Sequence, residues 1–273
     1  MYYKFLLFLF MFILFQTLYQ YFGKLNYNNI LDAPTPYSYS LQDNASNNGY
    51  NISIVYDYIN YFIFLILTFV LWIMISIVLK YRYKIINNNK LLQRNLVNIN
   101  TIHNTTLELV WTILPGVILI LIAIPSFRLL YILDEVIYPI ITIKAIGRQW
   151  YWTYEYNDNN ISKKYDSYLI DDSDLNIGDL RLLEVTDSIV LPILNNIRLL
   201  GTASDVIHSM GLPALSLKLD CIPGRINQTS LYINRFGKYY GVCSELCGVN
   251  HALMPIVIDA TSLEYYIKWL ANE

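Results

Sequence analysis

The chain has 273 residues, of which 55% are hydrophobic and 15% are charged, and this composition is too apolar for an ordinary soluble protein. Its 19 basic and 21 acidic side chains give a net charge of -2. A nucleic-acid-binding protein would carry a basic excess, so we expect no nucleic acid among the partners. The apolar excess instead predicts segments that lie within a lipid bilayer.

The first 51 residues divide into an apolar stretch and a polar one. Lys4 is followed by an apolar run that weakens at Gln16. This run is short for a bilayer span and resembles a signal segment, so we interpret residues 1–22 as a hydrophobic leader, with a retained extra segment as the alternative. Residues 23–51 are rich in Asn, Tyr, Ser and Pro, and we expect them to form an irregular polar segment.

Two apolar runs predict a transmembrane helical hairpin within residues 52–133. The first span, 59–79, contains no charge and is bounded by Asp57 and Lys80. The second span, about 109–130, contains two prolines, which membrane helices tolerate better than soluble ones do. Each run is about as long as the roughly 20 apolar residues that one bilayer crossing needs.

The linker between the spans decides the orientation of the hairpin. It contains five bases and no acid before Glu108. The positive-inside rule therefore places this linker in the cytoplasm or the mitochondrial matrix. Everything after the second span then lies across the membrane, and from Asp134 onward that part has 17 acids against 11 bases.

Residues 134–273 predict an all-β domain. Short β-prone runs alternate with turn residues, a spacing that is typical of a sandwich or a small barrel. The strands are expected at 139–156, 180–186, 188–193, 196–208, 214–219, 225–235, 238–242 and 254–260. Thr261 and Glu264 have the spacing of a capping box, which predicts a short amphipathic helix at the C-terminus.

The segment from Cys243 to Met254 reads C-S-E-L-C-G-V-N-H-A-L-M. It places two thiols, one imidazole and one thioether within twelve positions. Thiolate and thioether sulfurs favour copper, whereas a structural zinc site normally uses thiolates and imidazoles alone. A mononuclear blue-copper site needs one Cys, so a second Cys allows the sulfurs of Cys243 and Cys247 to bridge two metal ions.

A second imidazole must come from elsewhere in the chain. Apart from His251 there are only His103, on the other side of the membrane, and His208, at the end of a predicted strand. Taken alone, His208 would be interpreted as a core histidine, but its scarcity and position favour a ligand.

Other interpretations of the sulfur residues were also considered. A disulfide between the two thiols would explain neither His251 nor Met254. Cys221 is expected in the core, and Met210 is a weaker thioether candidate.

Taken together, the motifs resemble subunit II of the haem-copper respiratory oxidases, in its mitochondrial cytochrome c oxidase form. The resemblance covers nearly the whole chain. Its motifs are D-A-P-T-P at 32–36, W-T-I-L-P at 111–115, G-R-Q-W-Y-W-T-Y-E-Y at 147–156, L-R-L-L-E-V at 180–185, D-V-I-H-S at 205–209, I-P-G-R-I-N-Q-T at 222–229 and the copper loop. It implies a cupredoxin-like Greek-key sandwich behind the helical hairpin. It also implies a dinuclear copper centre, CuA, that accepts electrons from cytochrome c and passes them to haem a in subunit I.

The resemblance further implies a role for each ligand. Cys243 and Cys247 would bridge the coppers, His208 and Met254 would complete one ion, and His251 with the Glu245 carbonyl would complete the other. The Glu245 side chain matches the family's ligand to a magnesium ion at the border with subunit I. Oxygen reduction and proton pumping would take place in subunit I, so the chain is enzymatic only as part of a complex.

Location and partners follow from the same resemblance. We expect the mitochondrial inner membrane, with the CuA domain in the intermembrane space and the inter-helix loop in the matrix. The expected partners are subunit I, other oxidase subunits, cytochrome c and the lipid bilayer.

Three further sets of residues are assigned by resemblance. Trp150 matches the tryptophan through which electrons enter from cytochrome c. Glu108 matches a carboxylate at the mouth of a proton channel, although an interfacial helix-capping acid is the alternative. The carboxylates expected to attract cytochrome c are Glu155, Asp158, Asp166, Asp187 and Asp205. Because Lys163 and Lys164 stand where animal members carry more acids, docking is expected to be weaker or differently aimed.

Two other function classes compete with this hypothesis. A quinol oxidase subunit is structurally similar but lacks copper, and the presence of all six ligand positions argues against it. A membrane-tethered copper chaperone needs one exchangeable copper, and it gives Met254 and the aromatic run at 150–156 no role.

Overall fold

The computed structural model describes residues 12–14, 31–34, 41–81, 103–158 and 161–271. Most of the segment interpreted as a leader, 1–22, lies outside these residues, as does most of the basic linker between the spans. Both interpretations therefore stay predictions. The chain divides into two compact units, one made of residues 1–24 and 55–127 and the other of residues 25–54 and 128–273.

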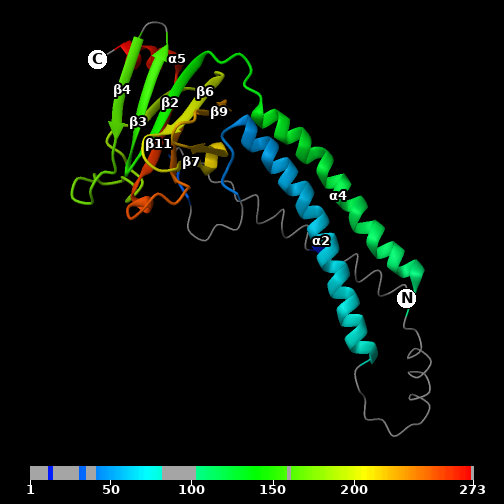
Figure 1. Ribbon diagram of the computed structural model, residues 1–273. Coiled ribbons are helices and arrows are strands. Elements are labelled where there is room, and N and C mark those ends of the chain that lie inside the picture. Colours follow the sequence, from blue (N-terminus) through cyan, green and yellow to red (C-terminus); the bar gives the residue numbers. More distant parts are fainter. Residues whose placement is uncertain (1–11, 15–30, 35–40, 82–102, 159–160, 272–273) are drawn as a thin grey trace, which may run out of the picture. The chain divides into compact units, whose positions relative to one another are not determined.

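Two long apolar helices confirm the predicted pair of spanning segments. Helix α2 covers Asn47–Tyr81 and helix α4 covers Thr105–Asp134. Both are long and apolar enough to cross a membrane. The hydroxyl of Tyr58 in α2 donates to the carbonyl of Leu121 in α4 over 3.3 Å, and the two helices run side by side in opposite directions (Figure 1).

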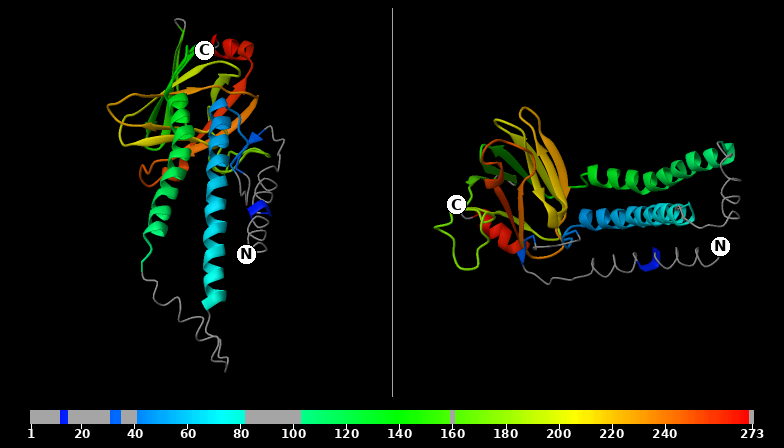
Figure 2. Two further views of the ribbon diagram at one scale, coloured as in Figure 1. Left: turned by 90° about the vertical axis from the view of Figure 1, so that its right-hand side faces the viewer. Right: turned by 90° about the horizontal axis from the view of Figure 1, so that it is seen from below.

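The second unit is built on a β-sandwich, which confirms the predicted fold class. One sheet has the order β5-β11-β10-β7-β8, with β1 beside β10, and the other has the order β4-β3-β2-β6-β9 (Figures 1 and 2). The strands are β1 Leu31–Asp32, β2 Ile141–Arg148, β3 Tyr151–Asp158, β4 Ile161–Ser167, β5 Ile189–Pro192, β6 Ile197–Ala203, β7 His208–Leu212, β8 Leu217–Cys221, β9 Asn227–Leu231, β10 Gly237–Cys243 and β11 Pro255–Thr261.

The core lies between the two sheets. Strand β6 alternates strictly between buried and half-buried residues, which is the period-2 pattern of a strand with one face in the core. Strand β3 contributes the fully buried aromatic rings of Trp152, Tyr154 and Tyr156. The same core cluster continues into Cys243, Cys247 and Met254, so the predicted copper loop is packed against the sandwich.

Several expected strand positions are wrong. The stretch 139–156 is two strands, β2 and β3, and β4 was missed because its Lys163 and Lys164 obscure the apolar alternation. Residues 180–186 form turns with a single bridge between Leu169 and Val185. His208 begins β7 and does not end the preceding strand.

The C-terminal helix forms as expected but with a different cap. Helix α5 covers Leu263–Ala271 and buries Tyr266 and Leu270. The hydroxyl of Ser262 accepts from the backbone N–H of Tyr265 over 3.2 Å, so Ser262 is the N-cap. Thr261, which we expected there, ends β11 and donates its hydroxyl to the Leu191 carbonyl over 3.3 Å.

Residues that precede the first helix also belong to the β-domain. Residues 31–34 and 41–46, which we call the strap, add β1 alongside β10. The fully buried Ala45 donates its N–H to the Ala214 carbonyl over 2.8 Å. The guanidinium of Arg235 forms ion pairs with the buried Asp32 at 2.7 Å and with Asp43 at 3.5 Å. The strap is thus held by a strand pair, backbone hydrogen bonds and charge.

Candidate metal centre

The six expected copper ligands lie together at one end of the sandwich. Cys243 is the last residue of β10, and Cys247 follows in the loop. His251 begins a single 3-10 turn, His251–Leu253, and Met254 directly precedes β11. Strand β7 brings His208 to the same end, because β7 pairs with β10. One loop and one neighbouring strand therefore supply all of the donors.

The donor atoms are close to one another. The Cys243 and Cys247 sulfurs are 3.9 Å apart. The His208 Nδ1 lies 4.0 Å from the Cys243 sulfur, and the His251 Nδ1 lies 3.6 Å from the Cys247 sulfur. The Met254 sulfur is 3.5 Å from the Cys247 sulfur. The Cys243 thiol also contacts the Glu245 carbonyl oxygen at 3.3 Å.

The chemistry of this donor set fits a pair of copper ions. All three cysteines are free thiols, so the disulfide alternative is not what the structure shows. A closed tetrahedral zinc site uses four donors, whereas six converge in this cluster and one of them is a thioether. His208, Cys243, Cys247 and Met254 are at most 4% exposed, so the donors are largely shielded from water.

The His208 ring is oriented by an acid that we had expected to lie on a docking surface. Asp205 Oδ1 lies 2.9 Å from His208 Nε2, which leaves Nδ1 facing Cys243. Asp205 also accepts hydrogen bonds from the backbone N–H of Gln149 at 2.6 Å and of Val206 at 2.7 Å. A hydrogen bond on the second ring nitrogen is the usual way in which a metal-binding histidine is fixed.

The two thiols have opposite tendencies to ionise. Burial favours a neutral thiol, but hydrogen bonds with His208 and with the backbone outweigh it and lower the pKa of Cys243 to about 6. Burial and the charge of Cys243 act in the same direction on Cys247 and raise its pKa. Cys243 is therefore the thiolate of the pair before a metal binds.

Trp150 contacts the metal loop directly. Its indole Nε1 donates to the Cys247 carbonyl over 3.3 Å, and the side-chain amide of Gln149 donates to the same oxygen over 2.9 Å. Gly248 has a positive φ of 119°, and a Cβ there would come within 3.2 Å of both side chains. No motif or spacing singled out Gln149 beyond its place beside Trp150.

The remaining expected acids differ in their surroundings. Glu155 forms ion pairs with Lys164 at 2.8 Å and Lys144 at 3.1 Å, and Lys164 with Lys144 holds the pKa of Glu155 below its usual value. Asp166 accepts from the Thr153 hydroxyl over 2.6 Å, and Asp187 is exposed. The side chain of Asp158, at the end of β3, lies outside the part that the structure describes.

Glu108 is on the first turn of α4. Its carboxylate lies 2.9 Å from His103 Nδ1, and both side chains are exposed. The helix cap is supplied by Asn104, whose side-chain oxygen accepts from the N–H of Leu107 over 3.1 Å. Asn104 therefore already caps the helix, which was the alternative role considered for Glu108.

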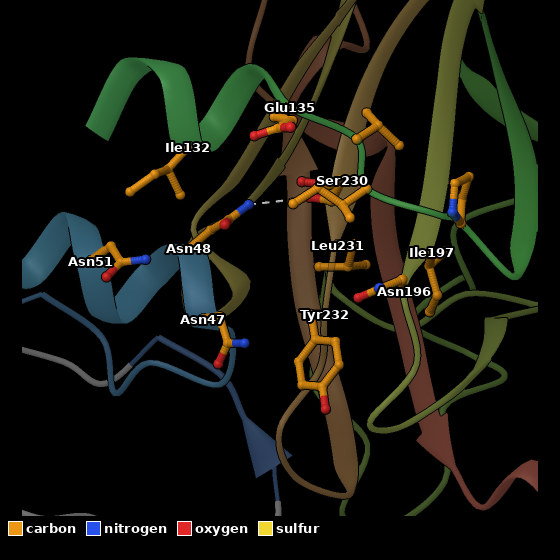
Figure 3. A pocket seen from close by; sticks show the side chains of 13 residues that line it. Asn47, Asn48, Asn51, Ile132, Glu135, Asn196, Ile197, Ser230, Leu231 and Tyr232 are labelled. Atoms are coloured by element: carbon orange, nitrogen blue, oxygen red, sulfur yellow. Dashed lines mark hydrogen bonds between the residues drawn. The ribbon is translucent and has the colours of Figure 1, made fainter. Parts of the chain in front are cut away.

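A separate hollow of about 450 Å³ lies in the second unit. Figure 3 shows Asn47, Asn48 and Asn51 of α2 on one side of it, with Ser230 of β9 opposite. The Asn48 amide donates to the Ser230 carbonyl over 3.2 Å. Its lining contains no His, Cys or Met. This hollow therefore offers no soft donor to a copper ion.

Comparisons with known proteins agree with this centre. A family described as "Cytochrome C oxidase subunit II, periplasmic domain" matches residues 141–261, and its transmembrane domain matches residues 34–129. Cytochrome c oxidase subunit 2 of Oenothera berteroana is 47% identical over 89% of this chain and 93% of its own length. The protein of the same name from Metridium senile is 47% identical over 88% and 92%. The crystal structure of the periplasmic domain of subunit II of Bradyrhizobium japonicum cytochrome oxidase is 41% identical and covers 50% of this chain and 94% of its own, with a TM-score of 0.46.

Proposed function

The chain belongs to the cytochrome c oxidase subunit II family, and we propose that it accepts single electrons from cytochrome c at a dinuclear copper centre and passes them to haem a in subunit I. The observation that carries this proposal is that six donors converge, and that two of them are free thiols whose sulfurs are 3.9 Å apart. As an oxidase subunit, the chain has other oxidase subunits as partners.

The protein's contribution is a rigid and largely dry set of ligands. A pair of copper ions held by Cys243, Cys247 and the neighbouring donors would supply a one-electron carrier. Cys243 is fixed by β10, His208 by β7 and Asp205, and Met254 by the start of β11. Because close-packed interiors resist displacement, these donors keep their positions when the charge of the centre changes. We further propose the ligand assignment of the family, with His208 and Met254 on one ion and His251 and the Glu245 carbonyl on the other.

We place the point at which electrons enter at Trp150. Its half-buried indole is hydrogen-bonded to the carbonyl of Cys247, a bridging ligand. This contact supports a short covalent and hydrogen-bonded connection from the ring to the sulfur. The side-chain amide of Gln149 donates to the same carbonyl and so helps to hold it in place beside the indole. Asp166 and Asp187, which are exposed, would attract the basic face of cytochrome c, and Asp158 is a further candidate from the sequence. Asp205, also expected there, holds the His208 ring.

Two further family roles are proposed on weaker support. The exposed Glu245 side chain would bind magnesium at the border with subunit I, since carboxylate oxygen suits that ion. Glu108 would lie at the mouth of a proton channel, and its 2.9 Å contact with the imidazole of His103 supports a polar site at this end of α4.

The chain is an inner-membrane protein, and we propose that its β-domain faces the intermembrane space and its basic linker the matrix. The strap precedes α2 and the β-domain follows α4, yet both fold into one unit. This supports two bilayer crossings with both outer ends on one side. The positive charge of the linker supports the matrix for the opposite side, and the exposed apolar surfaces of both helices would contact lipid.

Metal analysis combined with electron paramagnetic resonance on the full chain tests the proposal. We expect two coppers per chain and one unpaired electron shared equally between them. A single exchangeable copper would indicate a chaperone, and no copper would indicate a quinol oxidase subunit. The Trp150→Ala variant should slow electron arrival from cytochrome c and keep the copper spectrum. Loss of that spectrum would contradict the role given to Trp150.

A further inference from the structure

Gly147 lies against the ring of His208. A Cβ built on Gly147 would come within 2.7 Å of His208 Cδ2 and within 2.8 Å of both Cβ and Cγ. Contacts below 3.0 Å are not tolerated, so any side chain at position 147 must displace the imidazole or the strand that carries it. Gly147 is on β2 and His208 is on β7, so this contact crosses the core from one sheet to the other.

The backbone gives no other reason for a glycine at this position. Gly147 lies within β2 and pairs with Trp152 on one side and Ala203 on the other. It is not among the glycines with a positive φ. A glycine inside a strand weakens that strand relative to alanine and often marks a close approach of another group. The close approach in this sandwich is the predicted copper ligand.

The other sides of the His208 ring are also in contact. Asp205 Oδ1 lies 2.9 Å from Nε2. Trp152 meets the ring edge to face, with the centroids 6.0 Å apart. The ring is fully buried, and its remaining nitrogen, Nδ1, faces the Cys243 sulfur at 4.0 Å. Asp205, Trp152 and the bare Cα of Gly147 each lie against one side of the ring. The imidazole therefore has little space to rotate into another orientation.

We propose that Gly147 is a positioning residue for the metal centre, because its bare Cα is the surface on which the His208 imidazole rests with Nδ1 directed at Cys243. The inference rests on the proposed function only in so far as His208 binds copper. The steric contact itself exists without the metal. A side chain at position 147 would therefore have to push the His208 ring or strand β7 away.

The matched control is Gly201 on β6 of the same sheet. A Cβ on Gly201 would meet Leu219 Cδ2 at 2.8 Å and the Cys221 sulfur at 2.9 Å, which is similar crowding from the opposite sheet. Neither Leu219 nor Cys221 belongs to the donor set, but Cys221 on β8 is the cross-strand partner of His208 on β7. Both glycine-to-alanine variants should therefore lose stability. Only the one at position 147 places a methyl group directly against the His208 ring, whereas the one at position 201 reaches His208 only through Cys221.

The first test compares Gly147→Ala and Gly201→Ala in the full chain. We expect Gly147→Ala to shift the visible absorption and the hyperfine pattern of the copper-loaded protein. In copper-free protein with labelled histidines, it should also shift the His208 ring resonances. Gly201→Ala, which reaches His208 only through Cys221, should change both signals much less. Unchanged signals in Gly147→Ala, or the same changes in both variants, would overturn the proposal. If the wild-type protein shows no shared-electron spectrum, the proposed function fails, whereas the copper-free resonances still decide the role of Gly147.

A second test applies even if Gly147→Ala is too unstable to load with copper. Replacing His208 with Ala removes two of the three atoms that the new methyl group would meet. The Gly147→Ala change should therefore lower the denaturation midpoint less in the His208→Ala background than in the wild-type background. An equal shift in both backgrounds, or a double variant that still fails to fold, would show that the ring is not what Gly147 accommodates.

Discussion

The proposed attraction of cytochrome c by Glu155 depends on the neighbouring charge of Lys164. Its Nζ lies 2.8 Å from one Glu155 oxygen, and Lys144 lies 3.1 Å from the other. Two bases and one acid give this trio a net charge of +1. Lys164→Glu changes the net charge to -1, and Lys164→Gln changes it to zero. We expect the Glu variant to bind cytochrome c more tightly at low salt.

The size of the effect follows from Coulomb's law. One unit charge and one lysine about 10 Å apart in water interact by about 0.4 kcal/mol. A change of two units facing about three lysines of the partner amounts to about 2.5 kcal/mol, and screening at 10 mM salt reduces it to about 1.8 kcal/mol. This corresponds to a roughly twentyfold lower Kd for Lys164→Glu and about four- to fivefold for Lys164→Gln. At about 0.5 M salt the effect should nearly vanish.

Steady-state oxidation of cytochrome c by the assembled oxidase, measured from low to high salt, is the assay. KM should fall in two steps from wild type through Lys164→Gln to Lys164→Glu. Lys164→Arg keeps the charge and should leave KM at its wild-type value. A KM that does not change at 10 mM salt, or a change in KM that persists at 0.5 M salt, would show that the charges of Lys144, Glu155 and Lys164 do not act on cytochrome c.

Three more predictions concern the metal centre and the strap. Cys247→Ser should abolish the shared electron and leave at most a one-copper spectrum, because one bridging sulfur is lost; a wild-type resonance pattern would contradict the bridging role. Arg235→Gln should lower the free energy of unfolding of the β-domain by about 2–4 kcal/mol, because it leaves Asp32 buried and unpaired. Burial already raises the pKa of Asp32, so the carboxyl becomes neutral as the pH falls towards 3.8 and the loss of stability should shrink. A loss that does not depend on pH in denaturation curves would argue against the ion pair between Arg235 and Asp32 as its cause. Copper uptake at pH 8.5 should release at least one proton, because the raised pKa of Cys247 leaves that thiol protonated before a metal binds; copper uptake without proton release, measured in weak buffer, would refute this.

The donors were largely predictable because most of them are neighbours in the chain. Two thiols, an imidazole and a thioether within twelve residues indicate a metal before any fold is known, and His208 follows from the scarcity of histidine. The contacts of Gly147 and Gln149 were not predictable, because they form between segments that only the folded sandwich brings together. For the same reason the contact between Asp205 and His208 was not predictable. From the sequence we expected Asp205 on a docking surface, but in the structure its carboxylate lies 2.9 Å from His208 Nε2.

Strands were harder to place than ligands. Strand β4 carries Lys163, whose ammonium packs 4.3 Å from the centre of the Trp269 ring and donates to the Trp269 carbonyl over 3.1 Å. A charge that stabilises the contact with α5 interrupts the apolar alternation by which a strand is recognised. The stretch 180–186 has β-prone residues, but its backbone turns and forms only one bridge, at Val185.

The strap also affects the order in which the parts of the β-domain can assemble. Asp32 is separated from its partner Arg235 by 203 residues. At roughly 5–20 residues per second, the ribosome needs about 10–40 s to synthesise that distance. With the proposed topology, the segment ahead of α2 would be exported first and would have no partner strand until α4 had crossed. Export of this segment and export of the β-domain would then be two separate events, and β1 could pair with β10 only after the second.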